Sequence, residues 1–282
     1  MRMPTPREVF ALIERMRCIS SEAERRALVA ELGAVERPTV LSFLNAHAVN
    51  LCMRSQEALG AFDRSDLLLR DGVGLRIIMP WLGLPAGFNM NGTDFIPLLL
   101  KSLPKRRVAV YGTATPWLER ARAHLETVTP HVYADLQHGF HPVEHYVRQA
   151  RRSRPDLILL AMGMPRQEAV AAELRAALDH PVLIVNGGAI VDFLAGRFRR
   201  APENLQRAGF EWAFRLLQEP KRLFGRYVVG GFGFAATACR LRLAAPALPA
   251  RRPRPAPLRP AARSAVRRSS GTAAPAPMHK EL

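Results

Sequence analysis

The stretch from Leu157 to Val170, LILLAMGMPRQEAV, begins with five apolar residues, turns at a glycine and continues into a helical pattern that opens with proline. A short unbroken apolar run suits a strand buried on both faces, and proline is favoured in the first turn of a helix. Further short apolar runs alternate with helical patterns along the chain. They lie at 39–43, 67–69, 108–111, 131–134 and 182–185. This alternation predicts an α/β fold, a mainly parallel sheet with helices on both faces.

The predicted helices are of two kinds, those between the strands and those before them. Between the strands, helical patterns lie at 46–59, 73–82, 94–103, 116–127, 142–152 and 166–178. Before the first strand, residues 7–32 predict two helices, the second capped by Ser20 or Ser21. Glu24 is placed to close a capping box on Ser21.

The C-terminal part has a different pattern. Beyond Phe193 the alternation stops, and an Arg-rich helical stretch runs to about Leu243. From Ala244 onward, eight Pro mix with Ala, Arg and Ser and with almost no large apolar side chains. Such a composition cannot bury enough apolar surface to fold, so it predicts a disordered basic tail. The expected parts are N-terminal helices over 1–36, a Rossmann-like α/β domain over 37–198, a C-terminal helical appendage over 199–243 and the tail over 244–282.

The positive charge of the chain is concentrated in its C-terminal third. The sequence has 41 Lys and Arg against 24 Asp and Glu, a net charge of +17. Residues 240–282 contribute +9 and residues 193–226 contribute +5, which leaves about +3 for the rest. A surplus of this sign attracts nucleic acid, nucleotide phosphates or an acidic membrane surface. With 48% hydrophobic residues, the composition excludes a wholly disordered or collagen-like protein.

The cysteines and the apolar runs bear on the redox compartment of the protein and on whether it crosses a membrane. The three cysteines, Cys18, Cys52 and Cys239, lie far apart without a CxxC pair. Neither a disulfide framework nor a cysteine zinc site is therefore expected, which fits a reducing cytosol. The longest uncharged apolar run beyond the expected sheet, Tyr227–Cys239, has 13 residues. A membrane span needs about 20, so this run is not expected to cross a bilayer.

Small or polar residues follow every predicted strand. They include Asn45, Asp71, Gly112, His138, Gly139, Phe140, Gly163 and Gly187. In parallel sheets, ligands bind beyond the carboxyl ends of the strands. One crevice lined from many strands is therefore expected.

Asp71 is the carboxylate with the most suitable position in that crevice. It follows a predicted strand and precedes Gly72 and Gly74. A carboxylate there can project into the crevice, which is the position that a general base needs. The same residue also suits a turn or a helix N-cap, and both interpretations stay open.

The segments Gly163–Glu168 and Gly187–Asp192 each combine a strand end, a glycine turn and a helix start. Helix N-termini expose N–H groups and a partial positive charge that suit a phosphate. Arg166 is placed to add to that charge, and Gln167 to hydrogen-bond a sugar or base. A structural helix start, or tight packing of helix on sheet, would use the same residues. Neither GxGxxG nor GxxxxGK(S/T) occurs, so the Rossmann dinucleotide fingerprint and the Walker loop are absent.

A metal site is not expected. His138, His141 and His145 have spacings that suit one helical face, but a glycine and a proline interrupt a helix there. A solvated loop with one ligand-facing histidine is favoured over a zinc site. No DxD pair is expected in the crevice, since Asp63 and Asp66 are three apart and neither follows a strand.

Arginines recur in the appendage. Arg215, Arg222 and Arg226 have spacings of seven and four, which places them near one helical face if the helix re-forms after Pro220. Arginine binds phosphate through two parallel N–H donors, so such a row suits a diphosphate. A solvated face of Glu–Arg pairs would have the same pattern.

Taken together, these segments resemble the WecG/TagA/CpsF family of bacterial glycosyltransferases. The resemblance runs in order from about 38 to 230. It is carried by Asn45-Ala46, Asp71-Gly72-Val73-Gly74, Gly92-Thr93-Asp94, Gly163–Glu168, Gly187-Gly188 with Asp192, and Arg200-Ala201-Pro202 with Glu211-Trp212, Arg215, Glu219-Pro220 and Arg226-Tyr227. The chain departs from the usual family residues at Phe43, where many relatives have Thr, at Asn89, where many have Arg, and at Arg166, which replaces Lys.

The resemblance implies an inverting, metal-independent transfer of N-acetylmannosamine, glucuronic acid or a related hexose from a UDP-sugar to an undecaprenyl-diphosphate-linked saccharide. It implies a role in cell-surface polysaccharide or teichoic acid synthesis, with no cofactor. The enzyme would be cytoplasmic and peripheral on the inner face of the bacterial plasma membrane. Residues 37–198 would form the catalytic domain, and the appendage would approach the lipid diphosphate.

The resemblance also assigns roles to residues. Asp71 would be the base. The expected nucleotide-sugar site consists of Asn45, Gly112, His138, Gly139, Phe140, Gly163, Pro165, Arg166, Gln167, Glu168, Gly187, Gly188 and Asp192. The expected ligands of the acceptor diphosphate are Arg200, Arg215, Arg222 and Arg226.

Partners and competing functions stay open. An apolar set on the appendage suits attachment to anionic lipid, or packing on the core or on a second copy in a homo-oligomer. It consists of Leu216, Leu217, Leu223, Phe224, Val228 and Phe232. The alternatives are a basic nucleic-acid-binding protein and a nucleotide-dependent oxidoreductase on a similar sheet. The tail has no aromatic residue for base stacking and the glycine fingerprint is missing, so no specific nucleic acid is expected and both alternatives are disfavoured.

Overall fold

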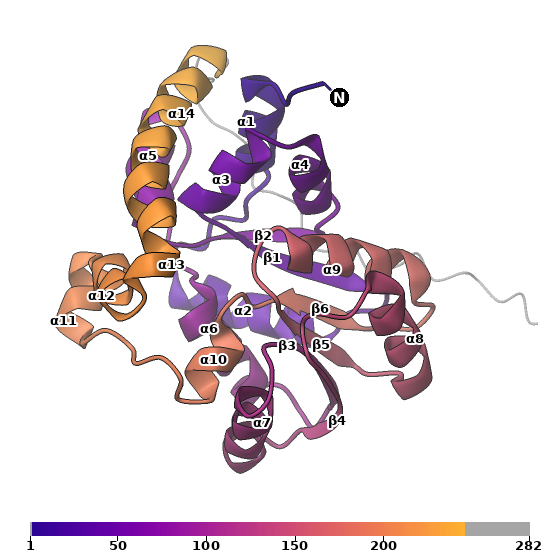
Figure 1. The fold of residues 1–282 in the computed structure, drawn as a ribbon. Coiled ribbons are helices and arrows are strands. Elements are labelled where there is room, and N and C mark those ends of the chain that lie inside the picture. Colours follow the sequence, from indigo (N-terminus) through magenta and orange to yellow (C-terminus); the bar gives the residue numbers. More distant parts are fainter. Residues whose placement is uncertain (1, 246–282) are drawn as a thin grey trace, which may run out of the picture.

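The computed structural model describes residues 2–245 (Figure 1). Its centre is a six-stranded sheet in which all neighbouring pairs are parallel, in the order β2-β1-β6-β5-β3-β4. The strands are β1 Thr39–Leu44, β2 Leu67–Arg70, β3 Arg107–Gly112, β4 Val132–Gln137, β5 Leu157–Ala161 and β6 Leu183–Asn186. The predicted Rossmann-like α/β fold with a parallel sheet is confirmed.

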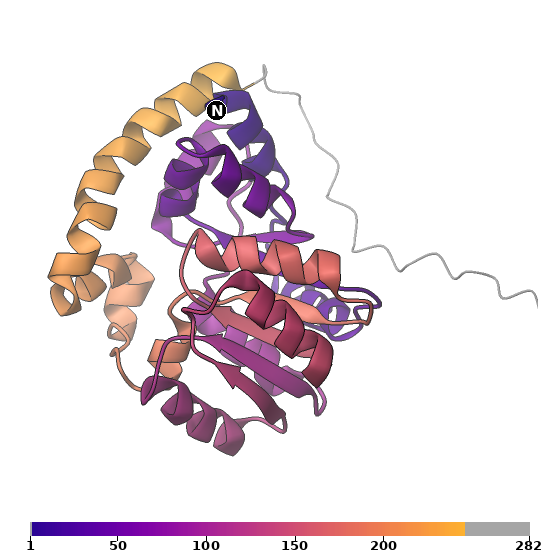
Figure 2. The same ribbon diagram turned by 45° about the vertical axis from the view of Figure 1, so that its right-hand side comes forward.

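Helices cover both faces of the sheet (Figures 1 and 2). One face shares an apolar cluster with α2 Glu22–Gly33, α6 Gly92–Ser102, α7 Trp117–Val128 and α10 Ile190–Leu194. The other face packs on α8 Val143–Ser153 and α9 Arg166–Ala177. A third apolar cluster joins α1 Pro6–Glu14, α3 Ala46–Cys52, α4 Gln56–Asp63 and α5 Val73–Trp81 beside β1 and β2.

Strand β4 differs from its predicted position at 131–134. It runs from Val132 to Gln137, so Asp135 lies in the strand and not in the loop after it. Asp135 is buried, and its Oδ2 accepts hydrogen bonds from the Tyr111 hydroxyl at 2.8 Å and from Ser153 Oγ at 3.1 Å. A polar residue that looks like a loop residue in the sequence is therefore satisfied inside the fold by β3 and α8.

Serine caps set two helix boundaries. The single pattern predicted at 46–59 forms two helices, because Ser55 Oγ accepts a backbone N–H of α4 at 3.1 Å and starts a new helix there. Ser21 caps α2 as predicted, with its Oγ accepting from the Glu24 N–H at 3.1 Å. The Glu24 carboxylate accepts from the Ser20 N–H at 2.7 Å. The capping box predicted a hydrogen bond from the Ser21 N–H to this carboxylate, whereas the donor is the N–H of Ser20, one residue earlier.

The Arg-rich stretch forms several short helices and one long helix. They are α11 Glu203–Ala208, α12 Glu211–Gln218, α13 Pro220–Phe224, a π-helical turn η1 Gly225–Val229, and α14 Gly230–Ala244. Figures 1 and 2 show α14 running alongside the core, where it packs on α1 and α3. Gly74 of α5 lies between α3 and α14, where an added Cβ would lie 2.9 Å from Ala46 Cβ and 3.2 Å from the Phe234 ring. This close approach explains the glycine.

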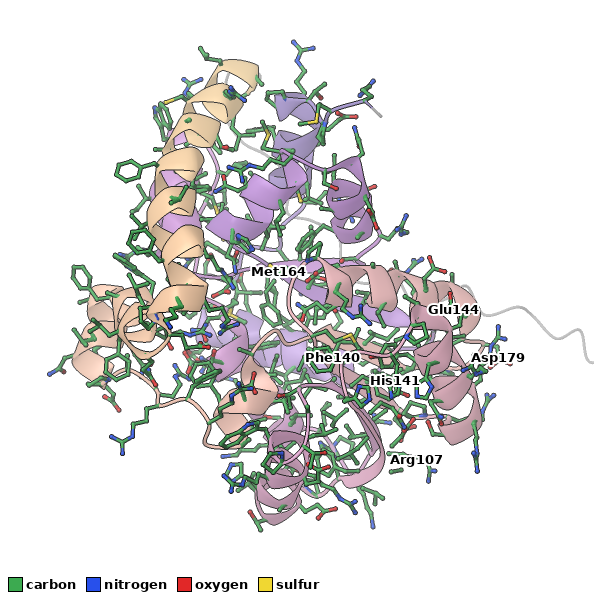
Figure 3. All side chains as sticks on the ribbon, viewed as in Figure 1. Arg107, Phe140, His141, Glu144, Met164 and Asp179 are labelled. Atoms are coloured by element: carbon green, nitrogen blue, oxygen red, sulfur yellow. The ribbon has the colours of Figure 1, made fainter. Side chains whose placement is uncertain are left out.

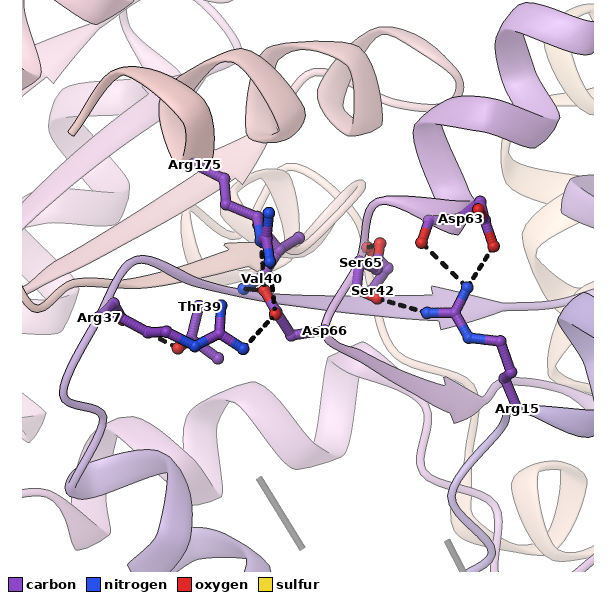
Figure 4. Close-up of polar contacts among 9 residues, drawn as sticks. All are labelled: Arg15, Arg37, Thr39, Val40, Ser42, Asp63, Ser65, Asp66 and Arg175. Carbon is purple, nitrogen blue, oxygen red and sulfur yellow. Dashed lines mark hydrogen bonds and ion pairs between the residues drawn. The ribbon is translucent and has the colours of Figure 1, made fainter. Parts of the chain in front are cut away.

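Asp66 ties together the amino ends of the sheet (Figure 4). Its Oδ1 accepts from Arg37 Nη2 at 2.7 Å, and its Oδ2 accepts from Arg175 Nε at 2.8 Å. Asp63 pairs with Arg15. Both carboxylates have structural partners, and Asp66 lies away from the carboxyl ends of the strands, where ligands bind.

Two sequence expectations concern the membrane and the tail. No helix among residues 2–245 combines the length and the apolar composition that crossing a membrane requires. The segment expected to be a disordered tail, 244–282, lies outside the described residues from 246 onward, and α14 continues through Ala244.

Candidate active site

A cavity of about 260 Å³ lies at the carboxyl ends of the strands. Its lining comes from the loops after the strands and from the appendage. Phe140 and Met164, labelled in Figure 3, lie on two of these loops. The predicted residues that line it are Asn45, Asp71, Gly139, Phe140, Gly163, Gln167, Gly187, Gly188, Asp192, Arg215, Arg222 and Arg226. The crevice expected from the strand ends is therefore present.

Asp71 follows β2 directly, and its backbone N–H donates to the Leu44 carbonyl at 2.8 Å. Asn45 Nδ2 donates to Asp71 Oδ2 at 3.1 Å, while Asn45 Oδ1 caps α3 by accepting from the Ala48 N–H at 3.0 Å. Because the cap fixes the amide, its NH₂ group is held toward the carboxylate. The N-cap of α5 is Gly72, so Asp71 does not cap that helix.

Two side chains hold the turn after Asp71. Gly72 has a φ of 84°, a conformation that favours glycine. Its N–H donates to Asn89 Oδ1 at 2.8 Å, and its carbonyl accepts from Arg70 Nη1 at 2.8 Å. Asn89, one of the departures from the usual family residues, therefore helps to place the backbone beside Asp71.

The charges around Asp71 come largely from the appendage. Burial raises the pKa of Asp71, whereas the hydrogen bond from Asn45 and the charges of Arg226 and Arg215 lower it, and the net direction is upward. Burial also lowers the pKa of Arg226, whose buried Nε has no hydrogen-bond partner among residues 2–245. A buried guanidinium with an open donor suits an anionic ligand.

Arg215 and Arg222 differ from Arg226 in their partners. The Arg215 guanidinium carbon lies 5.0 Å from the centre of the Phe193 ring. Arg222 Nε donates to Glu219 Oε1 at 2.7 Å, so its charge is paired. The three arginines line one cavity although they belong to three elements, α12, α13 and η1.

Two glycine turns form another part of the lining. Gly163 and Gly188 have φ values of 79° and 61°. Gln167 Oε1 accepts from the Gly188 N–H at 3.0 Å, and Gln167 Nε2 donates to Glu168 Oε1 at 2.8 Å. Glu168 is buried behind the lining, and burial raises its pKa to about 7. Both groups of the Gln167 amide are thus engaged within the protein, and its contact with a sugar or base stays a prediction.

Several residues of the lining were not predicted from the sequence. Asp192 Oδ1 accepts from Thr113 Oγ1 at 2.8 Å and pairs with Arg197 Nη1 at 3.1 Å, and both partners line the cavity. Asn186 and Phe193 line it as well. Thr113 and Asn186 lie just after predicted strands, where the crevice was expected, but no role in the site was assigned to them. Phe193 and Arg197 stand where the alternation stops, and no local pattern marks them.

Six predicted residues do not line the cavity: Gly112, His138, Pro165, Arg166, Glu168 and Arg200. Arg166 donates to the carbonyl of His141, which Figure 3 labels. The His138 ring stacks on His141 with centres 3.8 Å apart, and His141 stacks on His145 at 3.9 Å. The lone pairs of stacked rings lie in parallel planes, so the three do not converge on one ion. Across residues 2–245, no group of three His, Cys, Asp or Glu is placed to hold a metal ion.

Arg200 ties the appendage to the core. Its Nη1 donates to Asp94 Oδ1 at 2.8 Å and its Nη2 to Gln206 Oε1 at 2.8 Å. Its Nε lies 3.3 Å from Glu211 Oε1. Asp94 belongs to α6 of the core, whereas Gln206 and Glu211 belong to α11 and α12 of the appendage. The contact of Arg200 with an acceptor diphosphate stays a prediction.

The chain has relatives among known proteins. Residues 14–247 match the glycosyl transferase WecG/TagA/CpsF family. The chain is similar to three proteins named N-acetylglucosaminyldiphosphoundecaprenol N-acetyl-beta-D-mannosaminyltransferase. The protein of Bacillus spizizenii is 29% identical over 56% of this chain and 63% of its own length. The proteins of Staphylococcus aureus (strain MW2) and Bacillus subtilis (strain 168) are 25% and 24% identical, over 64% and 71% of this chain and 72% and 77% of theirs. With most of its length matched, the chain belongs to the WecG/TagA/CpsF family of glycosyltransferases.

Proposed function

We propose that this enzyme transfers N-acetylmannosamine, glucuronic acid or a related hexose from a UDP-sugar to an undecaprenyl-diphosphate-linked saccharide, with inversion and without a metal ion. The names of the relatives give this class of acceptor and, for them, N-acetylmannosamine as the sugar. The observation that carries the proposal is one cavity in which the carboxylate of Asp71 lies among the arginines of the appendage.

Asp71 is the proposed base. The acceptor hydroxyl attacks the anomeric carbon from the face opposite UDP, and its proton passes to the Asp71 carboxylate. The bond from that carbon to UDP breaks as the new bond forms, UDP leaves with the electron pair, and the configuration inverts. Burial raises the pKa of Asp71 and so strengthens it as a base, while Arg226 and Arg215 favour its ionised form.

The departing UDP needs its developing negative charge stabilised. The open Nε of Arg226, the guanidinium of Arg215 and the N-terminus of α9 lie in or beside the cavity. We assign this role to these groups and not to a metal ion because the cavity offers few free carboxylates. Its described lining residues include two acidic side chains, Asp71 and Asp192, and Asp192 is already engaged by two protein partners.

We further propose that the enzyme acts on the inner face of the bacterial plasma membrane as a peripheral protein, where it would meet a lipid-linked acceptor. The appendage supports this proposal, because Leu217, Phe224 and Phe232 are exposed. Leu223, which the sequence placed in the same apolar set, is buried, so for this residue the alternative of packing within the protein holds. The exposed residues that remain still suit contact with lipid.

The substitution Asp71→Asn tests the proposal. It keeps the size of the side chain and removes the base, so we expect transfer to fall by about 10²–10⁴-fold while the affinity for the UDP-sugar is retained. Transfer is measured with a short-chain lipid diphosphate acceptor, and binding by calorimetry. Asp179→Asn is the matched control, because this exposed aspartate, labelled in Figure 3, pairs with Arg154 on the surface. Retention of most activity in Asp71→Asn would remove Asp71 as the base.

Ligand binding separates the proposed activity from its alternatives. A nucleotide-sugar enzyme is stabilised against heat by UDP, an oxidoreductase by NAD, and a nucleic-acid-binding protein by DNA in a salt-dependent way. We expect the unfolding midpoint to rise with UDP alone. Incubation with a panel of UDP-sugars and the short-chain acceptor, with the product mass as readout, then identifies the sugar.

A further inference from the structure

The exposed large apolar side chains gather on two segments of the chain. Of the fourteen among residues 2–245, eleven lie between 73 and 88 or between 205 and 243. The eleven are Ile77, Trp81, Phe88, Leu205, Phe210, Trp212, Leu217, Phe224, Val229, Phe232 and Leu243. Scattered single apolar residues need no explanation, but a concentration of this kind marks an interaction surface. The second segment is the appendage, whereas the first belongs to the core.

Helix α5 divides into an inner and an outer face. Its inner residues Leu75, Ile78 and Met79 are buried in the cluster that also holds Phe234 of α14. Its outer face carries Ile77 and Trp81, one helical turn apart, which are 67% and 49% exposed. We name Ile77 and Trp81 the α5 face.

The α5 face adjoins the appendage. An added Cβ on Gly209, between α11 and α12, would lie 3.5 Å from Val73 Cγ2 and 3.6 Å from Arg76 Nη2. Arg76 directly precedes Ile77, and Phe210, directly after Gly209, is exposed. The outer side of α5 and the turn between α11 and α12 therefore form one continuous surface.

The segments that include and follow this surface carry more basic than acidic side chains, although Glu219 pairs with Arg222. Between Asp71 and Asp94, Arg76 is the only charged residue of the sequence. Between Glu219 and Ala245 there are five basic residues and no acidic one. Apolar side chains with basic neighbours suit an anionic lipid surface, and the indole ring of tryptophan favours the boundary between lipid and water.

We infer that the α5 face inserts into an anionic lipid bilayer and forms a membrane contact of the catalytic core, separate from that of the appendage. The inference rests on the proposed function, because a lipid-linked acceptor requires the cavity to reach a membrane. Helix α5 starts beside Asp71 and ends at Trp81, roughly 13 Å away by the rise of nine helical residues. Insertion at Trp81 therefore brings the base close to the bilayer surface.

A second copy of the chain fits this face less well. In a symmetric dimer the same patch occurs on both subunits, so Arg76 of each subunit would approach a surface of like charge. An anionic bilayer supplies the opposite charge. We therefore commit to lipid as the occupant, and self-association becomes an outcome of the test.

The fluorescence of Trp81 tests insertion directly. In the full-length chain, Trp117→Phe and Trp212→Phe leave Trp81 as the only tryptophan. With phosphatidylglycerol vesicles we expect its emission to shift to the blue and to be quenched by brominated lipid, with little change on phosphatidylcholine. Vesicle binding without a change in Trp81 emission would overturn the inference, because the appendage or the tail would then bind alone. A blue shift that tracks protein concentration without vesicles would overturn it in favour of a second copy.

Affinity gives an independent measurement. We expect Ile77→Ser combined with Trp81→Ser to weaken sedimentation with phosphatidylglycerol vesicles at least about tenfold, since two large apolar contacts are lost. Val132→Ser is the matched control, because Val132 is 45% exposed on the edge strand β4. Equal affinity of the double variant and the control would overturn the inference. Transfer by the wild type to a short-chain acceptor without vesicles is measured separately, so a failure of the proposed function is distinguishable.

Discussion

Glu168 illustrates how a residue of a binding motif acts at the residue scale. The sequence placed it in the nucleotide-sugar site, but it is 1% exposed and lies behind the lining. Its Oε1 accepts from Gln167, and Gln167 holds the N–H of Gly188, which lines the cavity. Its Oε2 has no hydrogen-bond partner among residues 2–245, and burial raises the pKa to about 7. Glu168 therefore positions Gln167, and its carboxyl group is largely protonated below neutral pH.

Replacing Glu168 should change how stability depends on pH. The folded-state pKa of about 7 exceeds the ordinary value of 4.5, so the folded state binds the extra proton. The contribution of Glu168 to the free energy of unfolding is fully present below pH 4.5. It is lost as the pH rises through 7, and the total loss is about 3 kcal/mol. We expect Glu168→Gln to be more stable than the wild type at pH 8.5 and to lose that advantage at pH 5, as measured by urea unfolding.

The control for this prediction is Glu144→Gln on the exposed surface of α8, labelled in Figure 3. It should leave the difference between the two pH values as in the wild type. If Glu168→Gln and the wild type show the same pH dependence, Glu168 is ionised in the folded protein at neutral pH.

Arg200 sets the geometry of the appendage at the scale of elements. Removal of its side chain leaves Asp94 on the core and Glu211 on the appendage without their shared cation. We expect Arg200→Ala to lower the free energy of unfolding by about 1–3 kcal/mol and to reduce transfer more than UDP-sugar binding, because Arg215 and Arg226 depend on the docked appendage. Limited proteolysis should cut the linker 195–202 faster in this variant.

A matched control variant and a double-mutant cycle test this prediction. Arg207→Ala removes an exposed ion pair with Glu203 and should have almost no effect. Asp94 also accepts from Asn91 Nδ2, so Asp94→Ala has a cost of its own, but adding it to Arg200→Ala should cost less than Asp94→Ala costs in the wild type, because the ion pair is already lost. Fully additive losses would mean that Arg200 acts elsewhere, for example on the acceptor diphosphate.

The elements show what a single sequence can predict and what it cannot. Unbroken apolar runs located β2, β5 and β6, because strands buried on both faces need few polar residues. The apolar run did not predict the full length of β4, because β4 contains the buried polar residue Asp135, whose hydrogen-bond partner Tyr111 lies on another strand. Arg200 was likewise assigned to the acceptor diphosphate, because its partner in the fold, Asp94, lies 106 residues away in the chain. Local patterns reveal burial and helix caps, whereas polar pairs formed by folding leave no local signal.

The site shows the same division. Asp71 was predicted from its place after a strand, and its carboxylate does line the cavity. The spacing of Arg215, Arg222 and Arg226 predicted a shared face, and all three line that cavity. The sequence left open whether these arginines pair with glutamates, and the structure shows Arg222 paired with Glu219 while Arg226 keeps an open donor. Which cation is available to a ligand is decided by the packing of the appendage.

Net charge acts at the scale of the whole molecule, and the segment 246–282 carries much of it. That segment has seven Arg and one Lys against one Glu. Because it has almost no large apolar side chains to add to a core, we expect a chain that ends after Ala245 to unfold at the same temperature as the full chain. On phosphatidylglycerol vesicles we expect its affinity to be at least about tenfold weaker in about 50 mM salt, since each basic residue near an anionic surface adds attraction.

Salt separates this electrostatic contribution from apolar insertion. In about 0.5 M salt, screening removes most of the attraction between separated charges, so the shortened and full chains should bind these vesicles alike. A full-length variant with Gln at the eight basic positions of 246–282 should behave like the shortened chain, which separates charge from length. If the shortened chain remains weaker in high salt, the segment binds lipid by more than its charge. The binding that persists in both chains at high salt is then attributable to the apolar residues of the appendage and the α5 face, and Ile77→Ser with Trp81→Ser should reduce it further.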